Sequence, residues 1–239
     1  MKLFRTDYPL TPSFDLINTS VKLLRDNLWP VFYLMFLPLL VTMVGLVMYE
    51  HGAYSGGMHS TDFRLWDSHS AAGSIVLAAG MLLTLLTTPG SMIMQLEAVR
   101  GGTPSTRDCF NRGLRYIVPF IGMSILMEFA IIGGFILFIV PGLFLLRSYY
   151  LSKFYLVDQQ LGPVASLKKS RAESKPNAGY IWGVIGVTIL FGILGGILQA
   201  IPVAGYLLSI IVGLFYGFAP AFRYNEIKNL KLPYDSPSK

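Results

Sequence analysis

The chain has 239 residues, of which 53% are hydrophobic and 13% are charged, and its mean hydropathy is +0.56. A soluble domain carries about 25% charged residues, so this composition excludes a soluble protein of one or two domains. The net charge is +6. All but three of the nineteen Lys and Arg residues lie in four short segments between apolar runs. This alternation is the positive-inside pattern of a multi-pass membrane protein, and it favours an anionic inner leaflet over nucleic acid as partner.

The first repeat-like unit spans residues 11–98. It opens with Thr11-Pro12, which predicts a helix start with Thr11 as N-cap. Apolar side chains at three- and four-residue spacing then predict an amphipathic interfacial helix. Two predicted spans follow, over residues 28–49 and 71–98, and Pro89 predicts a kink in the second. The first span lacks a small-residue cleavage site, so we read it as a span and not as a signal peptide.

Two further units, residues 103–157 and 162–224, repeat this order, and a polar tail covers residues 225–239. Thr103-Pro104 and Gly162-Pro163 each predict the start of a short basic helix. The second unit places spans at 116–140 and 142–157 around a Pro141-Gly142 turn, and the third places spans at 180–199 and up to residue 224. We therefore predict a single all-α integral membrane domain over residues 1–239. It has six transmembrane helices as three parallel hairpins, each preceded by a short cytoplasmic amphipathic helix. Both termini would be cytoplasmic, in the cell (inner) membrane.

The stretch from 141 to 170 combines a Pro-Gly turn, an apolar segment with a Val-Asp exit, and a Gly-Pro helix start followed by Leu and Ser. It resembles the membrane domain of the glycerophosphoryl diester phosphodiesterase family and is similar to the YciC-like inner-membrane proteins. The resemblance implies six spans with short amphipathic helices before each pair, and none of the matched residues is catalytic. No phosphodiesterase catalytic domain is attached, so the resemblance implies no enzymatic activity. The residues that carry it are Pro141, Gly142, Val157, Asp158, Gly162, Pro163, Leu167 and Ser170.

Glu128 lies in the middle of a predicted span, where an acidic side chain costs ~2.5–3.5 kcal/mol on insertion scales. In an antiparallel hairpin, Lys153 would lie at a similar depth, and Arg147 could reach inward through its long side chain. These intramembrane charges predict either a structural ion pair or an ion or substrate site. A protonated Glu128 beside a polar neighbour is the third alternative.

Six glycines form small-xxx-small pairs, the spacing that lets helix backbones approach closely. We expect them to pack within one bundle, with a homodimer face or a backbone-lined conduit as alternatives. They are Gly179, Gly183, Gly192, Gly196, Gly213 and Gly217.

Three predicted surface helices carry basic residues that would contact lipid headgroups, each worth ~1 kcal/mol near an anionic surface. They are Lys22, Arg25, Arg107, Arg112, Arg115, Lys168, Lys169 and Arg171. Anchoring explains them, and a pocket for a phospholipid or a phosphorylated metabolite is the alternative. The loop near residues 50–70 holds His51, His59 and His69, but their spacing matches no structural zinc motif, so we expect a solvated loop and no metal.

The sequence contains no P-loop, no Gly-x-Ser-x-Gly and no His-Glu-x-x-His, so we expect neither an enzyme nor a cofactor. Two functions stay open. The first is a non-catalytic membrane scaffold, assembly or envelope-stress factor that packs with lipid, a membrane-protein partner or copies of itself. The alternative is a small transporter or channel that uses Glu128 and the glycine-rich spans.

Overall fold

The computed structural model describes residues 10–55, 68–201 and 204–229, and every element in these ranges is a helix. The first unit holds α1 (Asp15–Asp26), α2 (Leu28–Val31), the π-helix η1 (Phe32–Phe36), α3 (Leu37–Ser55) and α4 (Ser68–Val99). It is followed by α5 (Thr106–Leu114), α6 (Ile117–Leu137), α7 (Ile139–Tyr149), α8 (Ser152–Gln159) and α9 (Pro163–Ser174). The chain continues with α10 (Ala178–Leu198), α11 (Ala204–Leu214) and α12 (Ala219–Asn229).

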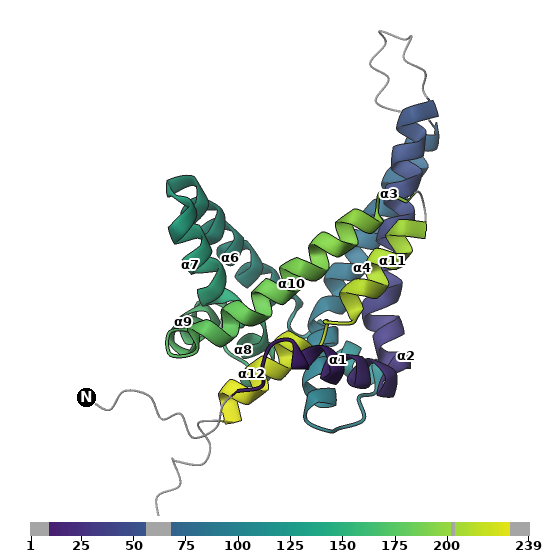
Figure 1. Ribbon diagram of the computed structural model, residues 1–239. Helices are drawn as coiled ribbons and strands as arrows, with labels where there is room; N and C mark the ends of the chain where they lie inside the picture. Colours follow the sequence, from purple (N-terminus) through teal and green to yellow (C-terminus); the bar gives the residue numbers. More distant parts are fainter. Residues whose placement is uncertain (1–9, 56–67, 202–203, 230–239) are drawn as a thin grey trace, which may run out of the picture.

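Two helix pairs spread apart from a common base (Figure 1). One arm consists of α3 and α4, the other of α6 and α7, and α10 crosses between them. The base gathers α1, α8, α9 and α12. The long helix α4 connects these parts, because it contacts α3, α5, α8 and α12.

Five helical segments of the described chain are long and apolar enough to cross a membrane, at 28–49, 71–99, 117–137, 178–198 and 204–229. This supports the prediction of an all-helical, multi-pass membrane protein. The predicted span at 142–157 is not among the five, because Tyr150 and Leu151 divide it between α7 and α8. The described residues therefore show five candidate spans, and the sixth predicted span is not confirmed.

The turn between α6 and α7 lies earlier than predicted. Phe138 has an extended backbone between the two helices, and Pro141-Gly142 belong to the first turn of α7. Proline is favoured in the first turn of a helix because its missing N–H has no partner there. The Pro-Gly pair therefore marks a helix start and not the turn itself.

Two of the three predicted helix starts were also too early. Ser105 precedes α5, and α1 begins only at Asp15 because Thr11 is bound to Glu226 instead. The Gly162-Pro163 start of α9 is confirmed. Within the predicted polar tail, residues 225–229 continue α12 as helix.

Close packing of α3 on α4 depends on glycines that the sequence analysis did not single out. A Cβ added to Gly80 would lie 2.5 Å from the Thr42 backbone nitrogen, and one on Gly73 would lie 2.6 Å from that of Tyr49. Glycine at these positions lets the two backbones touch. The Thr42 and Thr84 hydroxyls lie 3.3 Å apart across the same interface.

The short helices α5 and α9 each pack beside an irregularity in a preceding helix. The irregularity is a proline in α4 and the break between α7 and α8. On α5, a Cβ at Gly113 would lie 2.5 Å from the Gly90 nitrogen, next to Pro89 within α4. On α9, the hydroxyls of Ser170 and Ser174 donate to the Ser148 carbonyl oxygen at 2.8 and 3.3 Å, beside the α7–α8 break. These serines supply donors where the helix ends and carbonyl groups lack helical partners.

The helix α1 occupies the corresponding place on the last hairpin. The Tyr216 hydroxyl, between α11 and α12, donates to the Ser13 carbonyl oxygen at 2.9 Å, and Leu16 packs beside Tyr216 in the core. The first surface helix in the sequence therefore closes the structure against its last unit.

Candidate functional site

Asp158, the penultimate residue of α8, is the centre of a polar cluster at the base. Its Oδ1 atom lies 2.8 Å from Nη2 of Arg100, just after α4. Its Oδ2 atom accepts hydrogen bonds from Lys228 Nζ at 2.6 Å and from the Tyr224 hydroxyl at 2.7 Å, both on α12. We call Asp158, Arg100, Tyr224 and Lys228 the Asp158 clasp. It joins the ends of α4 and α8 to α12, the last described helix.

The carboxylate of Asp158 is held in its charged form. Its side chain is 8% exposed, and this burial alone would raise the pKa. The hydrogen bonds from Lys228, Tyr224 and Arg100 outweigh that effect, so the pKa of Asp158 lies below its ordinary value. A buried carboxylate with two cationic partners is a fixed structural charge, because any approaching group must first displace those partners.

A second cluster ties the N-terminal segment to α12. Arg223 is fully buried; its Nη1 donates to Glu226 at 2.7 Å and its Nη2 donates to the Thr11 carbonyl oxygen at 2.6 Å. The Thr11 backbone N–H in turn donates to Glu226 at 3.1 Å. The guanidinium also lies over the Tyr180 ring, 5.4 Å from its centroid. Charges again link separate segments of the fold.

The third cluster joins α4 to α5. Glu97 forms an ion pair with Arg112 and lies 3.5 Å from the Cys109 sulfur. Burial, reinforced by the charge of Glu97, raises the pKa of the Cys109 thiol to about 11. The thiol therefore stays protonated at neutral pH, and a protonated thiol is a poor nucleophile.

The structure does not join Glu128 to either predicted cation. Within the described residues, no ion pair within 4.0 Å links Glu128 to Lys153 or Arg147. Lys153 Nζ instead lies 5.6 Å from the centroid of the Phe120 ring, and the Arg147 guanidinium lies 4.6 Å from that of Phe144. Glu128 is exposed on α6. A similar depth in the hairpin therefore does not pair Glu128 with a cation, because each of the two cations lies over an aromatic ring.

The predicted glycine packing is wrong for most of the glycines. A Cβ on Gly179, Gly192, Gly196 or Gly213 would meet no atom within 4 Å, so no described helix packs directly against these positions. Gly183 instead faces the Ser13 side chain, and Gly217 approaches the Met35 methyl group. Gly192, Gly196, Gly213 and Gly217 line a groove of about 410 Å³ between α10 and α11. The glycines have no side chains to fill this space, and the two helices diverge along it (Figure 1).

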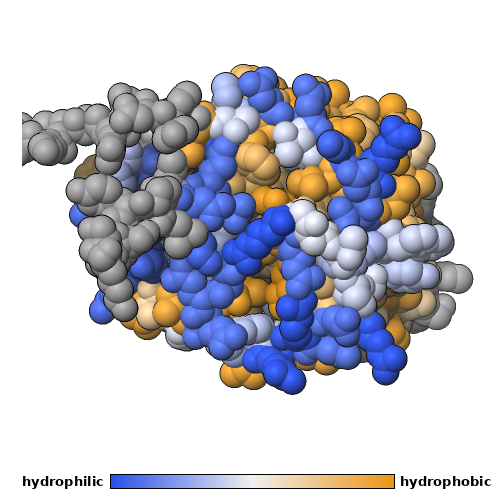
Figure 2. Space-filling view, turned by 90° about the horizontal axis from the view of Figure 1, so that it is seen from below, coloured by the Kyte–Doolittle hydropathy of each residue, from blue (hydrophilic) through white to orange (hydrophobic). Residues whose placement is uncertain are grey.

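The eight predicted headgroup residues, listed above from Lys22 to Arg171, are all exposed. Two of them also form ion pairs, Arg112 with Glu97 and Lys169 with Glu173. Figure 2 shows the base from below, with hydrophilic side chains spread across it. In α1, Phe14 and Val21 are exposed while Leu16 and Ser20 are buried. Ile17 and Leu24 of the same predicted apolar face pack partly buried against the core, so the protein covers only part of that face.

The histidine hypothesis lies outside the residues whose side chains the structure describes. Within the described part, no group of three or more His, Cys, Asp or Glu side chains is placed to hold a metal ion. Comparison of the chain with family models, curated proteins and solved structures finds no match.

Sequence reasoning missed the Asp158 clasp, although a signal for it was present. Arg100, Asp158 and Lys228 each follow or end the second apolar segment of a unit. If the units are parallel repeats, these ends lie on the same side of the membrane and close to each other. Charges of opposite sign at equivalent positions of the repeats would then have predicted the contact.

Proposed function

We propose that this chain is a non-catalytic scaffold of a cell membrane, with its basic face and both termini in the cytoplasm. The observation that carries the proposal is the Asp158 clasp, in which one buried carboxylate holds Arg100 and Lys228 from two other units. A carrier that alternates between two states must let its units move against each other. A clasp across all three units opposes such motion, and it leaves no charge of the cluster free for a substrate.

The arms supply the surfaces that such a scaffold would present. Phe129, Ile136 and Phe138 on the α6–α7 arm are 74, 80 and 76% exposed. In a bilayer these side chains meet lipid tails or another protein's spans. The exposed basic residues of α1, α5 and α9 would hold the base against an anionic leaflet.

Solute flux tests the proposal against its alternative. The scaffold predicts that purified protein in liposomes gives no proton, sodium or potassium flux above that of empty vesicles. Flux that disappears in Glu128→Gln would instead establish the transporter. Two controls exclude an inactive preparation. Cooperative unfolding shows that the reconstituted protein is folded, and cleavage by added protease shows whether the basic face has one orientation in the liposomes.

A small transporter remains the second candidate because of the groove between α10 and α11. Besides the glycines, Thr188, Gln199 and Ser209 line it and supply polar groups to a groove whose lining is mostly apolar. A path here would use the groove and not the arms. Substitution of Gly192 by Leu should then abolish any flux, because the side chain would fill the groove.

A further inference from the structure

One face of α6 carries a stripe that includes polar groups without partners. Phe120, Ser124 and Glu128 follow each other at four-residue spacing and therefore lie along one face of α6. The Ser124 hydroxyl oxygen is buried and has no hydrogen-bond partner in the described part of the chain. Glu128 is exposed and has no ion pair with any described residue. Polar groups left unsatisfied at membrane depth are costly, and such positions point to a ligand.

Lys153 of α8 completes this stripe at its lower end. Its ammonium lies 5.6 Å from the centroid of the Phe120 ring, and Phe120 lies on the same face of α6 as Glu128. Within the described residues the two charges form no ion pair. A hydroxyl, an ammonium and a carboxylate therefore lie along one side of α6.

The stripe runs from near the base towards the middle of the bilayer. Glu128 is about three turns above Ile117, or ~16 Å at 1.5 Å per residue. Lys153 lies ~8 Å along α8 from Asp158 of the clasp by the same rise. The flexible Lys153 stem can shorten the remaining distance.

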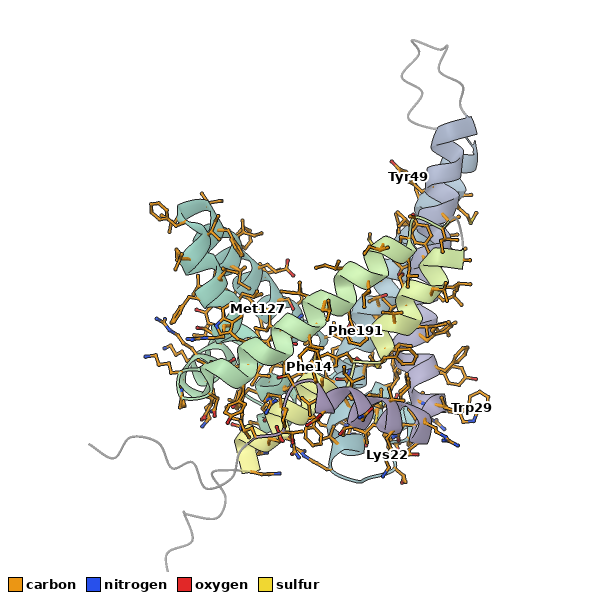
Figure 3. The ribbon with its side chains drawn as sticks, in the orientation of Figure 1. Phe14, Lys22, Trp29, Tyr49, Met127 and Phe191 are labelled. Atoms are coloured by element: carbon orange, nitrogen blue, oxygen red, sulfur yellow. The ribbon has the colours of Figure 1, made fainter. Side chains whose placement is uncertain are left out.

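The Glu128 end of the stripe is open to lipid. The neighbouring side chains Ile125 and Phe129 are 49 and 74% exposed. Met127, next to Glu128, lies between the arm and α10 (Figure 3). Its sulfur accepts a hydrogen bond from Ser152 at 3.7 Å, which fixes this side of α6 against α8. A lipid beside α6 therefore reaches Glu128 without passing through a closed core.

We propose that this stripe binds the headgroup of a zwitterionic phospholipid with a primary ammonium, such as phosphatidylethanolamine. The lipid phosphate would accept hydrogen bonds from Lys153 and Ser124, and its ammonium would donate to the Glu128 carboxylate. The proposal rests on the scaffold function and names the lipid that the scaffold holds.

Other occupants satisfy only part of the stripe. A partner helix with a single basic residue neutralises Glu128 but leaves Lys153 unpaired, and a second copy of this chain adds another carboxylate of the same sign. Phosphatidylglycerol offers no cation to Glu128. Phosphatidylcholine carries both charges, but its quaternary ammonium has no N–H to donate. The donors and acceptors of the stripe therefore select a primary ammonium.

The test is native mass spectrometry of the purified full chain in detergent with each of the three lipids. We expect wild type to bind phosphatidylethanolamine roughly tenfold more tightly than phosphatidylcholine, the size of one charge-assisted hydrogen bond. Glu128→Gln should remove this preference, and Lys153→Met should weaken retention of both zwitterionic lipids. Lys153→Arg keeps the charge and should retain binding, so that a loss in the Met variant through misfolding is recognised.

Matched variants separate this site from the basic face. The triple change Lys168→Ser, Lys169→Ser and Arg171→Ser should lower retention of phosphatidylglycerol and leave the preference for phosphatidylethanolamine intact. Equal retention of phosphatidylethanolamine and phosphatidylcholine by wild type, or a preference that survives Glu128→Gln, overturns the proposal. A photo-crosslinker at Phe129 that yields a protein adduct and no lipid adduct in native membranes also overturns it.

The scaffold function fails on a different result. Flux that depends on Glu128 in liposomes contradicts the scaffold even if the lipid preference is found. Absence of both the preference and the flux contradicts only the lipid site.

Discussion

Nη2 of Arg100 lies 2.8 Å from Oδ1 of Asp158, which joins the end of α4 to the end of α8 across a separation of 58 positions in the chain. Lys228 contacts the other oxygen of the same carboxylate at 2.6 Å. Three helices of a membrane domain thus meet at one acidic side chain. Both cations depend on Asp158, since neither has another acidic partner among the described ion pairs.

Removal of the Asp158 charge should destabilise the protein strongly. Asp158→Asn leaves Arg100 and Lys228 facing a neutral amide, and loss of one partner of a buried pair costs ~3–5 kcal/mol. Lys228→Met should cost only ~1 kcal/mol, because that side chain is 33% exposed and water screens its charge. Thermal unfolding in detergent measures both, with the exposed Asp26→Asn as control. Equal effects of Asp158→Asn and Asp26→Asn would show that the clasp contributes nothing.

The same carboxylate predicts a pH dependence. Because the folded pKa of Asp158 lies below its ordinary value, the charge adds stability above the unfolded pKa of about 3.9. That stability is lost as pH falls through the folded pKa. The gap in unfolding temperature between wild type and Asp158→Asn should therefore be constant from pH 7 to about 5 and narrow below about 4. A gap that widens on acidification would have the wrong sign for this account.

Cys109 should resist alkylation in the folded protein. Its side chain is buried and its pKa is raised to about 11, so the thiolate fraction at pH 7.5 is very small. We expect a maleimide to label wild type only after denaturation, as read by intact mass. Glu97→Gln should leave the thiol buried and still slow to react. Rapid labelling of the native protein would place α5 away from α4.

Two glycines provide a matched pair for helix packing. Gly80→Ala should destabilise by ~1–3 kcal/mol, since the added Cβ would meet the Thr42 backbone and force α3 from α4. Gly192→Ala has open space at the Cβ and should stabilise by up to ~1 kcal/mol through helix propensity. Chemical denaturation of the two variants checks the ranking. The reverse ranking would restore the packing role that the sequence alone predicted for Gly192.

The sequence predicted the class of fold because apolar runs and basic segments follow directly from transfer free energies. It could not locate Gly80, because small-xxx-small spacing does not say which face meets another helix. It placed Glu128 and Lys153 at similar depth and offered an ion pair between them, which is not found among the described residues. Depth along a hairpin leaves the rotation about each helix axis undetermined. Thr11 failed as an N-cap for a similar reason: its long-range partner Glu226 lies at the other end of the chain.

The central claim is that the two arms of the scaffold do not move relative to each other. The distance between the arms tests this claim most directly. Spin labels at Leu82 of α4 and Ile132 of α6, both exposed, can be introduced on a Cys109→Ala background in lipid nanodiscs. Pulsed dipolar spectroscopy would then give the distribution of distances between the labels. The account predicts one narrow distribution that is the same at pH 5 and pH 8 and in Glu128→Gln. Two distances whose populations change with pH in wild type and not in Glu128→Gln would contradict it.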